Sequence, residues 1–329
     1  MDNLELLISL YKIHSPSGKE KRMRKFIRKK AFEYGADHAE TDRHGNLFMT
    51  KGTGDYPCVV AHMDQVQEFH SKDFQCFVCG DTILGYSQSN KKQEGLGADD
   101  KNGIFVALEC LRKFDNIKLA FFTEEECGTI GSSAADISFF DDCRFVVQCD
   151  RNGNSDFVNN IYSTSLCSEE FLHDTEMEKF GYAPHAGGLT DVYALSENFL
   201  DVSCCNMSCG YYNPHTDEEV TSISDLERCR DFVFHIIENC KKVYPCRKEM
   251  ARYTNSFYQD GHIYDYETEY DYETDYDYMD SIIRMDYGLS FDEIMEYYGY
   301  GFYSNRNTLE QIYYELKDVY CGITEGRES

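Results

Sequence analysis

Positive charge is scarce in this sequence. Its 329 residues include 32 lysines and arginines against 59 aspartates and glutamates, which gives a formal net charge of −27. A basic face that binds nucleic acid is therefore not expected. No apolar run approaches the ~18–20 residues of a membrane-spanning helix, so we expect no membrane partner. We also expect no secretory signal, because Asp2 and Glu5 interrupt the first apolar stretch and no cleavage site follows it.

The 15 cysteines are irregularly spaced. With no secretory leader expected, this pattern predicts reduced thiols and a cytoplasmic protein. Cys76 and Cys79 form a C-x-x-C pair, but no second pair stands at the spacing of a zinc knuckle. Since two residues cannot complete a tetrahedral site, we interpret these two cysteines as packing residues.

Hydrophobic periodicity predicts an α/β protein, and the 42% of apolar residues is enough for a sizeable core. The expected strands are 47–51, 58–61, 117–122, 144–148 and 201–207, with a hairpin over 74–86. The expected helices are 4–11, 20–34, one that follows Asp99, 191–198, and 224–243, the last with a capping box at Ser224 to Glu227.

Three consecutive carboxylates, Glu124, Glu125 and Glu126, follow the apolar strand 117–122. Neighbouring carboxylates repel each other, and a solvated surface turn is one explanation for such a run. The other explanation is a site in which one carboxylate binds a metal ion and its neighbour acts as a base. The second explanation requires partners elsewhere in the chain.

Candidate partners for these carboxylates occur elsewhere in the chain, after predicted strands or at the start of a predicted helix. His62 ends the strand 58–61, and Asp64 lies two residues further on, where it can hold the other ring nitrogen. A structural histidine is the alternative interpretation of His62. Asp99 begins a helix after a glycine-rich turn, where an acid can also serve as a simple cap. Asp150 and His215 each follow a predicted strand.

Taken in order, these residues are His62, Asp99, Glu125, Glu126, Asp150 and His215. Strand ends at one edge of an open α/β sheet form a ligand crevice. Carboxylates and imidazoles without thiolates suit zinc, manganese or cobalt. Two metal ions that share one carboxylate would lie about 3.5–4 Å apart. The series therefore predicts a two-metal site.

The sequence resembles the co-catalytic di-zinc exopeptidase superfamily, which includes aminopeptidases, peptidase T and glutamyl aminopeptidases. The resemblance spans about residues 4–243. It is carried by the motifs Ser15-Pro16-Ser17-Gly18, Asp42…Gly45-Asn46, His62-Met63-Asp64, Gly97-Ala98-Asp99-Asp100-Lys101-Asn102-Gly103, Glu125-Glu126-Cys127-Gly128, Cys149-Asp150 and His215. It implies a three-layer α/β/α sandwich around a mixed, mostly parallel sheet, the phosphorylase/hydrolase-like fold of zinc peptidases.

The same resemblance implies the roles of the site residues. His62 and Asp150 would hold one Zn²⁺, Glu126 and His215 the other, and Asp99 would bridge them, with Co²⁺ or Mn²⁺ as possible substitutes. Asp64 would support His62, and a cis peptide would join Asp99 to Asp100.

The implied activity is hydrolysis of the N-terminal bond of a peptide by a water that lies between the metal ions and is activated by Glu125. Asp191 and His185 are further candidates, for the substrate's amino terminus or for support of the ligands.

The chain departs from larger relatives in two places. Only 37 positions separate His62 from Asp99, and only 65 separate Asp150 from His215. Neither interval has room for the inserted dimerisation or lid domain that some relatives carry, so a catalytic domain alone is expected. A related deacylase or carboxypeptidase is the alternative function. An inactive scaffold that binds partners is a third hypothesis, and the complete set of ligands argues against it.

The composition changes towards the C-terminus. Tyr264 to Glu269 recurs as Tyr270 to Asp275, and no basic residue occurs in this repeat. We therefore predict a catalytic domain over 1–257, an acidic linker over 258–280 and a small helical module over 281–329. The linker could instead bind cations or a partner, and the module could dock on the catalytic domain or on an unknown protein.

Overall fold

The structure is a computed structural model that describes residues 2–162 and 164–246. The predicted linker 258–280, the predicted module 281–329 and the last residues of the predicted domain 1–257 lie outside the described residues.

The described chain contains both helices and strands, with the strands β1 to β6 in succession between α2 and α3. The helices are α1 (Asp2–Tyr11), α2 (Lys21–Glu33), α3 (Ala98–Lys113), α4 (Ile130–Ser133), α5 (Glu169–Thr175), α6 (Asp191–Glu197) and α7 (Ile223–Asn239). The strands are β1 (His38–Thr41), β2 (Leu47–Lys51), β3 (Tyr56–His62), β4 (Phe74–Cys79), β5 (Thr82–Ser87), β6 (Lys92–Glu94), β7 (Ile117–Phe122), β8 (Cys143–Arg151), β9 (Asp156–Ile161), β10 (Thr164–Ser165), β11 (Ala183–Gly187), β12 (Cys204–Ser208), β13 (Tyr211–Tyr212) and β14 (Val220–Ser222).

A nine-stranded mixed sheet forms the centre of the molecule. Its order is β1-β2-β7-β3-β8-β12-β9-β10, and β11 pairs with β9. The four strands β7, β3, β8 and β12 run parallel to their neighbours in this group. Every residue of β3 and β7 is buried, as expected for apolar strands that are covered on both faces.

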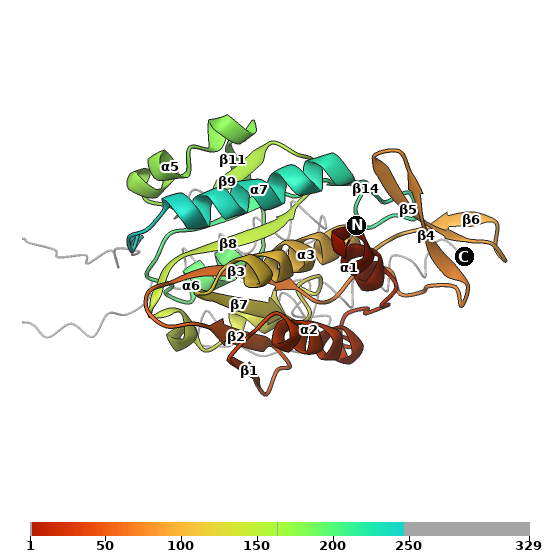
Figure 1. Cartoon of the computed structure of the whole chain (residues 1–329), viewed down its shortest axis with the longest axis horizontal. Coiled ribbons are helices and arrows are strands. Elements are labelled where there is room, and N and C mark those ends of the chain that lie inside the picture. Colours follow the sequence, from red (N-terminus) through yellow and green to blue (C-terminus); the bar gives the residue numbers. More distant parts are fainter. Residues whose placement is uncertain (1, 163, 247–329) are drawn as a thin grey trace, which may run out of the picture. The chain divides into compact units, whose positions relative to one another are not determined.

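Helices cover both faces of this sheet. In Figure 1, α1, α2, α3 and α7 lie in front of the sheet, and α6 lies behind it. The sheet therefore forms the middle layer between two layers of helices, and the predicted α/β/α architecture is confirmed. The parallel order of the central strands brings their carboxyl ends to one edge, where the candidate residues lie.

A second, five-stranded sheet lies beyond one end of the first. Its order is β13-β14-β5-β4, with β6 also paired to β5 (Figure 1). The predicted hairpin is confirmed as β4 and β5. The other strands were not predicted, because β14 pairs with β5 across more than 130 residues of sequence and short strands have no local signal that reveals so distant a partner.

Several predicted boundaries are wrong. The strand expected over 201–207 begins at Cys204, and the last described helix ends at Asn239 rather than near residue 243. That helix is capped by the Ser222 hydroxyl, which accepts a hydrogen bond from the Asp225 amide, so the cap lies two residues before the predicted one. Among the described residues, no helix combines the length and the apolar character that crossing a membrane requires.

Gly131 connects the turn before β2 with the loop after β7. The Asn46 side-chain amide donates to the Gly131 carbonyl, and its oxygen accepts from the Thr123 amide, at 2.8 and 3.2 Å. A Cβ atom at Gly131 would overlap both the Asn46 side chain and the Thr123 carbonyl. Gly131 thereby fixes the point at which the chain leaves β7 for Glu124–Glu126.

We expect Gly131→Ala to lower the free energy of unfolding by about 1–3 kcal/mol, the usual cost of overpacking a closed site. Urea denaturation measures this change. Gly188→Ala is the matched control, because nothing lies within 4 Å of the added Cβ there. Equal stability of the two variants would show that Gly131 does not hold the loop in this way.

Candidate metal centre

The predicted metal ligands come from five separate segments. His62 ends β3 and Asp150 lies near the end of β8, the strand next to it in the sheet. Asp99 lies in the first turn of α3, Glu126 in the loop after β7, and His215 between β13 and β14. The structure brings all five side chains together, in two groups that share Asp99.

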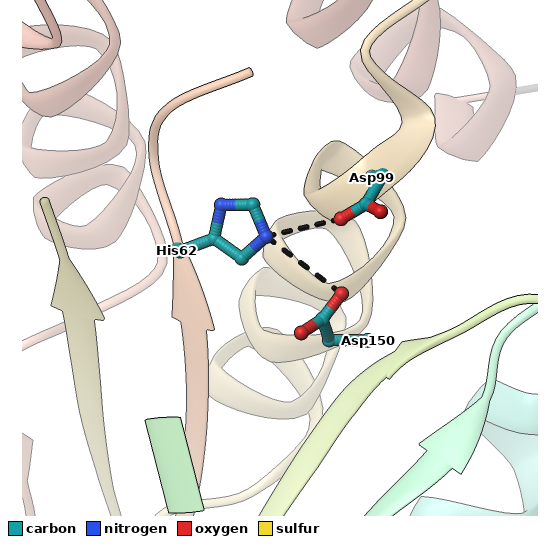
Figure 2. Close-up of side chains that lie close together, drawn as sticks. All are labelled: His62, Asp99 and Asp150. Atoms are coloured by element: carbon teal, nitrogen blue, oxygen red, sulfur yellow. Dashed lines mark hydrogen bonds and ion pairs between the residues drawn. The ribbon is translucent and has the colours of Figure 1, made fainter. Parts of the chain in front are cut away.

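The first group consists of His62, Asp99 and Asp150 (Figure 2). His62 Nε2 lies 3.0 Å from Asp99 Oδ1 and 3.7 Å from Asp150 Oδ1. The His62 side chain is 1% exposed. One nitrogen therefore faces two carboxylate oxygens in a buried position, which is a donor set that suits a divalent cation.

The second group consists of Asp99, Glu126 and His215. His215 Nε2 lies 3.2 Å from Asp99 Oδ2 and 3.2 Å from Glu126 Oε1. Asp99 therefore directs one carboxylate oxygen to each group. In each group, the candidate ligand atoms all lie within 4.8 Å of one another.

The backbone around Asp99 is held by hydrogen bonds that were not predicted. Gly97 has φ 63°, and the peptide between Asp99 and Asp100 is cis, as the resemblance implied. The buried Glu219 carboxylate accepts from the Gly97 amide at 2.6 Å and from the Asp99 amide at 3.2 Å. Glu219 lies in an acidic surface-like stretch of sequence, so no local signal distinguishes it.

Asp64 connects His62 with the acidic loop. Its Oδ1 lies 3.3 Å from His62 Nδ1, and its carboxylate accepts from the amides of Glu125 and Glu126 at 3.1 and 3.2 Å. Ser17 also donates to it at 2.8 Å. Although burial opposes ionisation, His62 and these donors lower the pKa of Asp64. Asp64 therefore stays a carboxylate that orients the imidazole.

Four further side chains hold Asp150, and sequence reasoning missed all of them. Oδ2 accepts from Gln148 Nε2 at 3.1 Å and from the Thr190 hydroxyl at 3.2 Å, and Oδ1 from the Tyr211 hydroxyl at 3.3 Å. Asn206 Oδ1 accepts from the Asp150 backbone amide, and Asn206 Nδ2 donates to the Asp150 carbonyl. Gln148 precedes Asp150 by two residues on β8, which is the one signal that could have identified it.

Asp191 and His185 occupy different surroundings. Asp191 is fully buried at the start of α6, and its Oδ2 accepts from Gln148 Nε2 at 3.1 Å. Burial raises its pKa to about 7. His185 lies on β11 with half of its side chain exposed, and its Nδ1 lies 3.8 Å from Asp156 Oδ2. Neither residue belongs to a metal-ligand group found in the described part of the chain.

Glu125 directly precedes Glu126 of the second group, and its amide donates to Asp64. Burial raises its pKa well above the ordinary value, and the charges of Asp150, Asp191 and Glu126 raise it further, against the effect of His62.

The cluster carries more negative than positive charge. The two groups hold three carboxylates and two imidazoles, and no lysine or arginine forms an ion pair with them in the described residues. Hydrogen bonds to Asp99 and Glu126 raise the pKa of His215 to about 10, and burial with the nearby Asp99 raises that of Asp150 to about 8. Both shifts let protons offset the negative charge. Divalent cations would offset it equally well, so these residues fit two metal ions.

No family model and no curated protein matches the sequence. The aminopeptidase PepT of Bacillus cereus is similar in structure, with 15% identity over 73% of this chain and 98% of its own, at a TM-score of 0.59. A Staphylococcus aureus tripeptidase has 15% sequence identity over 72% of this chain and 97% of its own, at a TM-score of 0.58. A Desulfurococcus kamchatkensis aminopeptidase has 15% sequence identity over 72% of this chain and 94% of its own, at a TM-score of 0.56.

At such identities the likeness is one of fold. The described residues therefore share the fold of these aminopeptidases and this tripeptidase. The resemblance predicted from the motifs is confirmed at the level of the fold.

Proposed function

We propose that this protein is a metal-dependent aminopeptidase that hydrolyses the N-terminal bond of peptides. The observation that carries the proposal is the position of Asp99, whose two oxygens face two groups that each add one histidine and one acid. The fold that the chain shares with two aminopeptidases and a tripeptidase supports the same class of reaction.

His62 and Asp150 would hold one cation, Glu126 and His215 the other, and Asp99 both. Zinc is the first choice, with cobalt or manganese as alternatives for the same ligands. When bound, the pair of cations supplies a Lewis acid, which lowers the pKa of a water molecule and polarises the substrate carbonyl. Asp64 keeps the His62 ring in position, and Asp64 in turn is fixed by the Ser17 hydroxyl and by two loop amides.

Glu125 is the proposed general base. Its carboxylate takes the proton of the attacking water and then delivers it to the nitrogen of the leaving amine. The backbone amides of Glu125 and Glu126 both donate to the Asp64 carboxylate. Asp64 therefore positions the loop that carries both the proposed base and a metal ligand. Glu124, the first acid of the triplet, has no role in this scheme.

Asp191 supports Asp150 rather than binding substrate in this proposal. It is fully buried and shares the Gln148 amide with Asp150, so it fixes the direction in which that amide donates. We further propose a reducing compartment such as the cytoplasm, since the described cysteines form no disulfide.

A mass-spectrometric digest tests the proposal. Matched peptide pools, one with free and one with acetylated N-termini, are incubated with the zinc-, cobalt- or manganese-loaded protein. We expect N-terminal residues to be lost from the free pool alone. Cleavage of the acetylated pool would instead favour a deacylase or a carboxypeptidase on the same site. If neither pool changes while two cations are bound, the proposal is wrong.

A further inference from the structure

A closed ring of hydrogen bonds lies beside the turn that carries Asp99. It consists of a buried lysine, a buried glutamate, two glutamine side chains and the main chain of two further residues: Lys101, Glu219, Gln65, Gln67, Leu96 and Gly97. None of them belongs to a metal-ligand group of the described chain. The hydrogen-bond ring therefore surrounds the metal centre without being part of it.

The ring begins at Lys101, whose side chain is buried. Its ammonium group donates to the Leu96 carbonyl at 2.9 Å and to Gln65 Oε1 at 2.6 Å. Gln65 Nε2 then donates to Gln67 Oε1 at 3.0 Å. Because an ammonium group can only donate, the Gln65 amide directs its oxygen towards Lys101 and its nitrogen towards Gln67.

The ring ends at Glu219, which is also buried. Its Oε2 accepts from Gln67 Nε2 at 3.3 Å and from the Gly97 amide at 2.6 Å, and its Oε1 accepts from the Asp99 amide at 3.2 Å. Three donors therefore converge on one carboxylate, which accepts through both oxygens when it is ionised. A glutamine at this position would keep the shape of the side chain but direct an NH₂ group at one or more of these donors.

The ring also contacts the loop that carries His215. A Cβ atom at Gly95 would lie 2.6 Å from Gln67 Nε2 and 2.6 Å from the Thr216 carbonyl, so both groups pack against this glycine. Thr216 directly follows His215, and Glu219 lies three residues further on. The ring therefore joins the His215 loop to the turn that carries the bridging carboxylate.

The two metal-ligand groups differ in their other support. The His62 side chain is 1% exposed, and Asp64 orients it. The His215 side chain is 49% exposed, and within the described residues its ring contacts as ion-pair partners only the other members of its group, Asp99 and Glu126. The position of the His215 imidazole therefore depends on the main chain of its loop, which the ring fixes.

We propose that Glu219 and Gln67 are positioning residues that hold the His215 loop against the turn of Asp99 and thereby strengthen the binding of the second cation. The inference rests on the proposed two-metal function. Groups that orient a metal ligand commonly contribute about 10–100-fold to metal affinity. The first cation keeps its own histidine and aspartate, with the hydrogen bonds that support them, so its affinity depends much less on the ring.

The Glu219→Gln variant tests this inference. The metal-free full chain is titrated with zinc in competition with a chromophoric chelator, which resolves the two binding steps without any measurement of activity. We expect the affinity of the second step to fall by about 10–100-fold and that of the first step by a much smaller factor. A residue that only stabilises the fold would not weaken one step selectively.

Glu94→Gln is the matched control. Glu94 is likewise buried and accepts from the Ser71 amide at 2.9 Å, but it lies outside the ring and both metal-ligand groups. It should keep both zinc affinities. Gln67→Met is the second variant, because it keeps the length of a partly exposed side chain and removes its bonds to Gln65 and Glu219. It should weaken the second step in the same direction even if Glu219→Gln does not fold.

The outcomes separate this inference from the proposed function. If the wild type binds two zinc ions and cleaves peptides while both ring variants keep the second step, the inference is wrong and the proposed function stands. Equal weakening of the two steps, or the same selective loss in Glu94→Gln, also overturns it. If the wild type binds fewer than two zinc ions, the two-metal function fails and this inference with it.

Discussion

Replacing Glu125 with glutamine should lower kcat by about 10²–10⁴-fold, the usual contribution of a general acid–base residue. The amide keeps the size of the side chain but cannot accept the proton of the attacking water. Metal binding should stay at two cations per chain, because Glu125 belongs to neither ligand group. Steady-state kinetics on a cleaved peptide, with metal analysis of the same preparation, measures both quantities.

Glu124→Gln is the matched control for this variant. Glu124 is the neighbouring acid on the same loop, and it belongs to neither ligand group. Its replacement should leave kcat within about twofold of the wild type. A large loss in Glu124→Gln with none in Glu125→Gln would shift the assignment of the base by one residue.

Replacing Asp99 with alanine should abolish binding of both cations, because its two oxygens serve both groups. The main-chain bonds that hold this turn come from the Gly97 and Asp99 amides to Glu219, so the side chain can be removed without losing them. Metal content after dialysis should fall from about two ions per chain to near zero, and peptide hydrolysis should fall with it.

His215→Ala provides the contrast. It removes one member of the second group and leaves the His62 group intact, so it should retain about one ion per chain. Circular dichroism of both variants checks that they fold. If Asp99→Ala and His215→Ala lose the same number of ions, the bridging role of Asp99 is wrong.

Sequence reasoning found the ligand candidates because their positions follow from local signals. His62 and Asp150 follow apolar stretches that predict buried strands, and β3 and β8 prove to be neighbours in the sheet. Parallel central strands bring such ends to one edge without further information. Asp99 was located by its glycine-rich turn, and the loop of Glu125 by the strand before it.

Two of the supporting residues had no such signal. Thr190 and Tyr211 lie 40 and 61 residues from Asp150 in the sequence, and only the folded chain brings them to it. Gln148, two residues before Asp150 on β8, is the exception. β12 pairs with β9 in the antiparallel direction and with β8 in the parallel direction. The hydrophobic periodicity of a strand does not encode the direction of its neighbours. The sequence therefore predicts none of β9, β10, α5 and β11.

The account depends most directly on two cations that share Asp99. A crystal soaked in zinc and measured on either side of the zinc absorption edge would locate them by anomalous scattering. We predict two peaks, one at His62 and Asp150 and the other at Glu126 and His215, both beside the Asp99 carboxylate. A single peak, or peaks away from Asp99, would contradict the proposed two-metal centre.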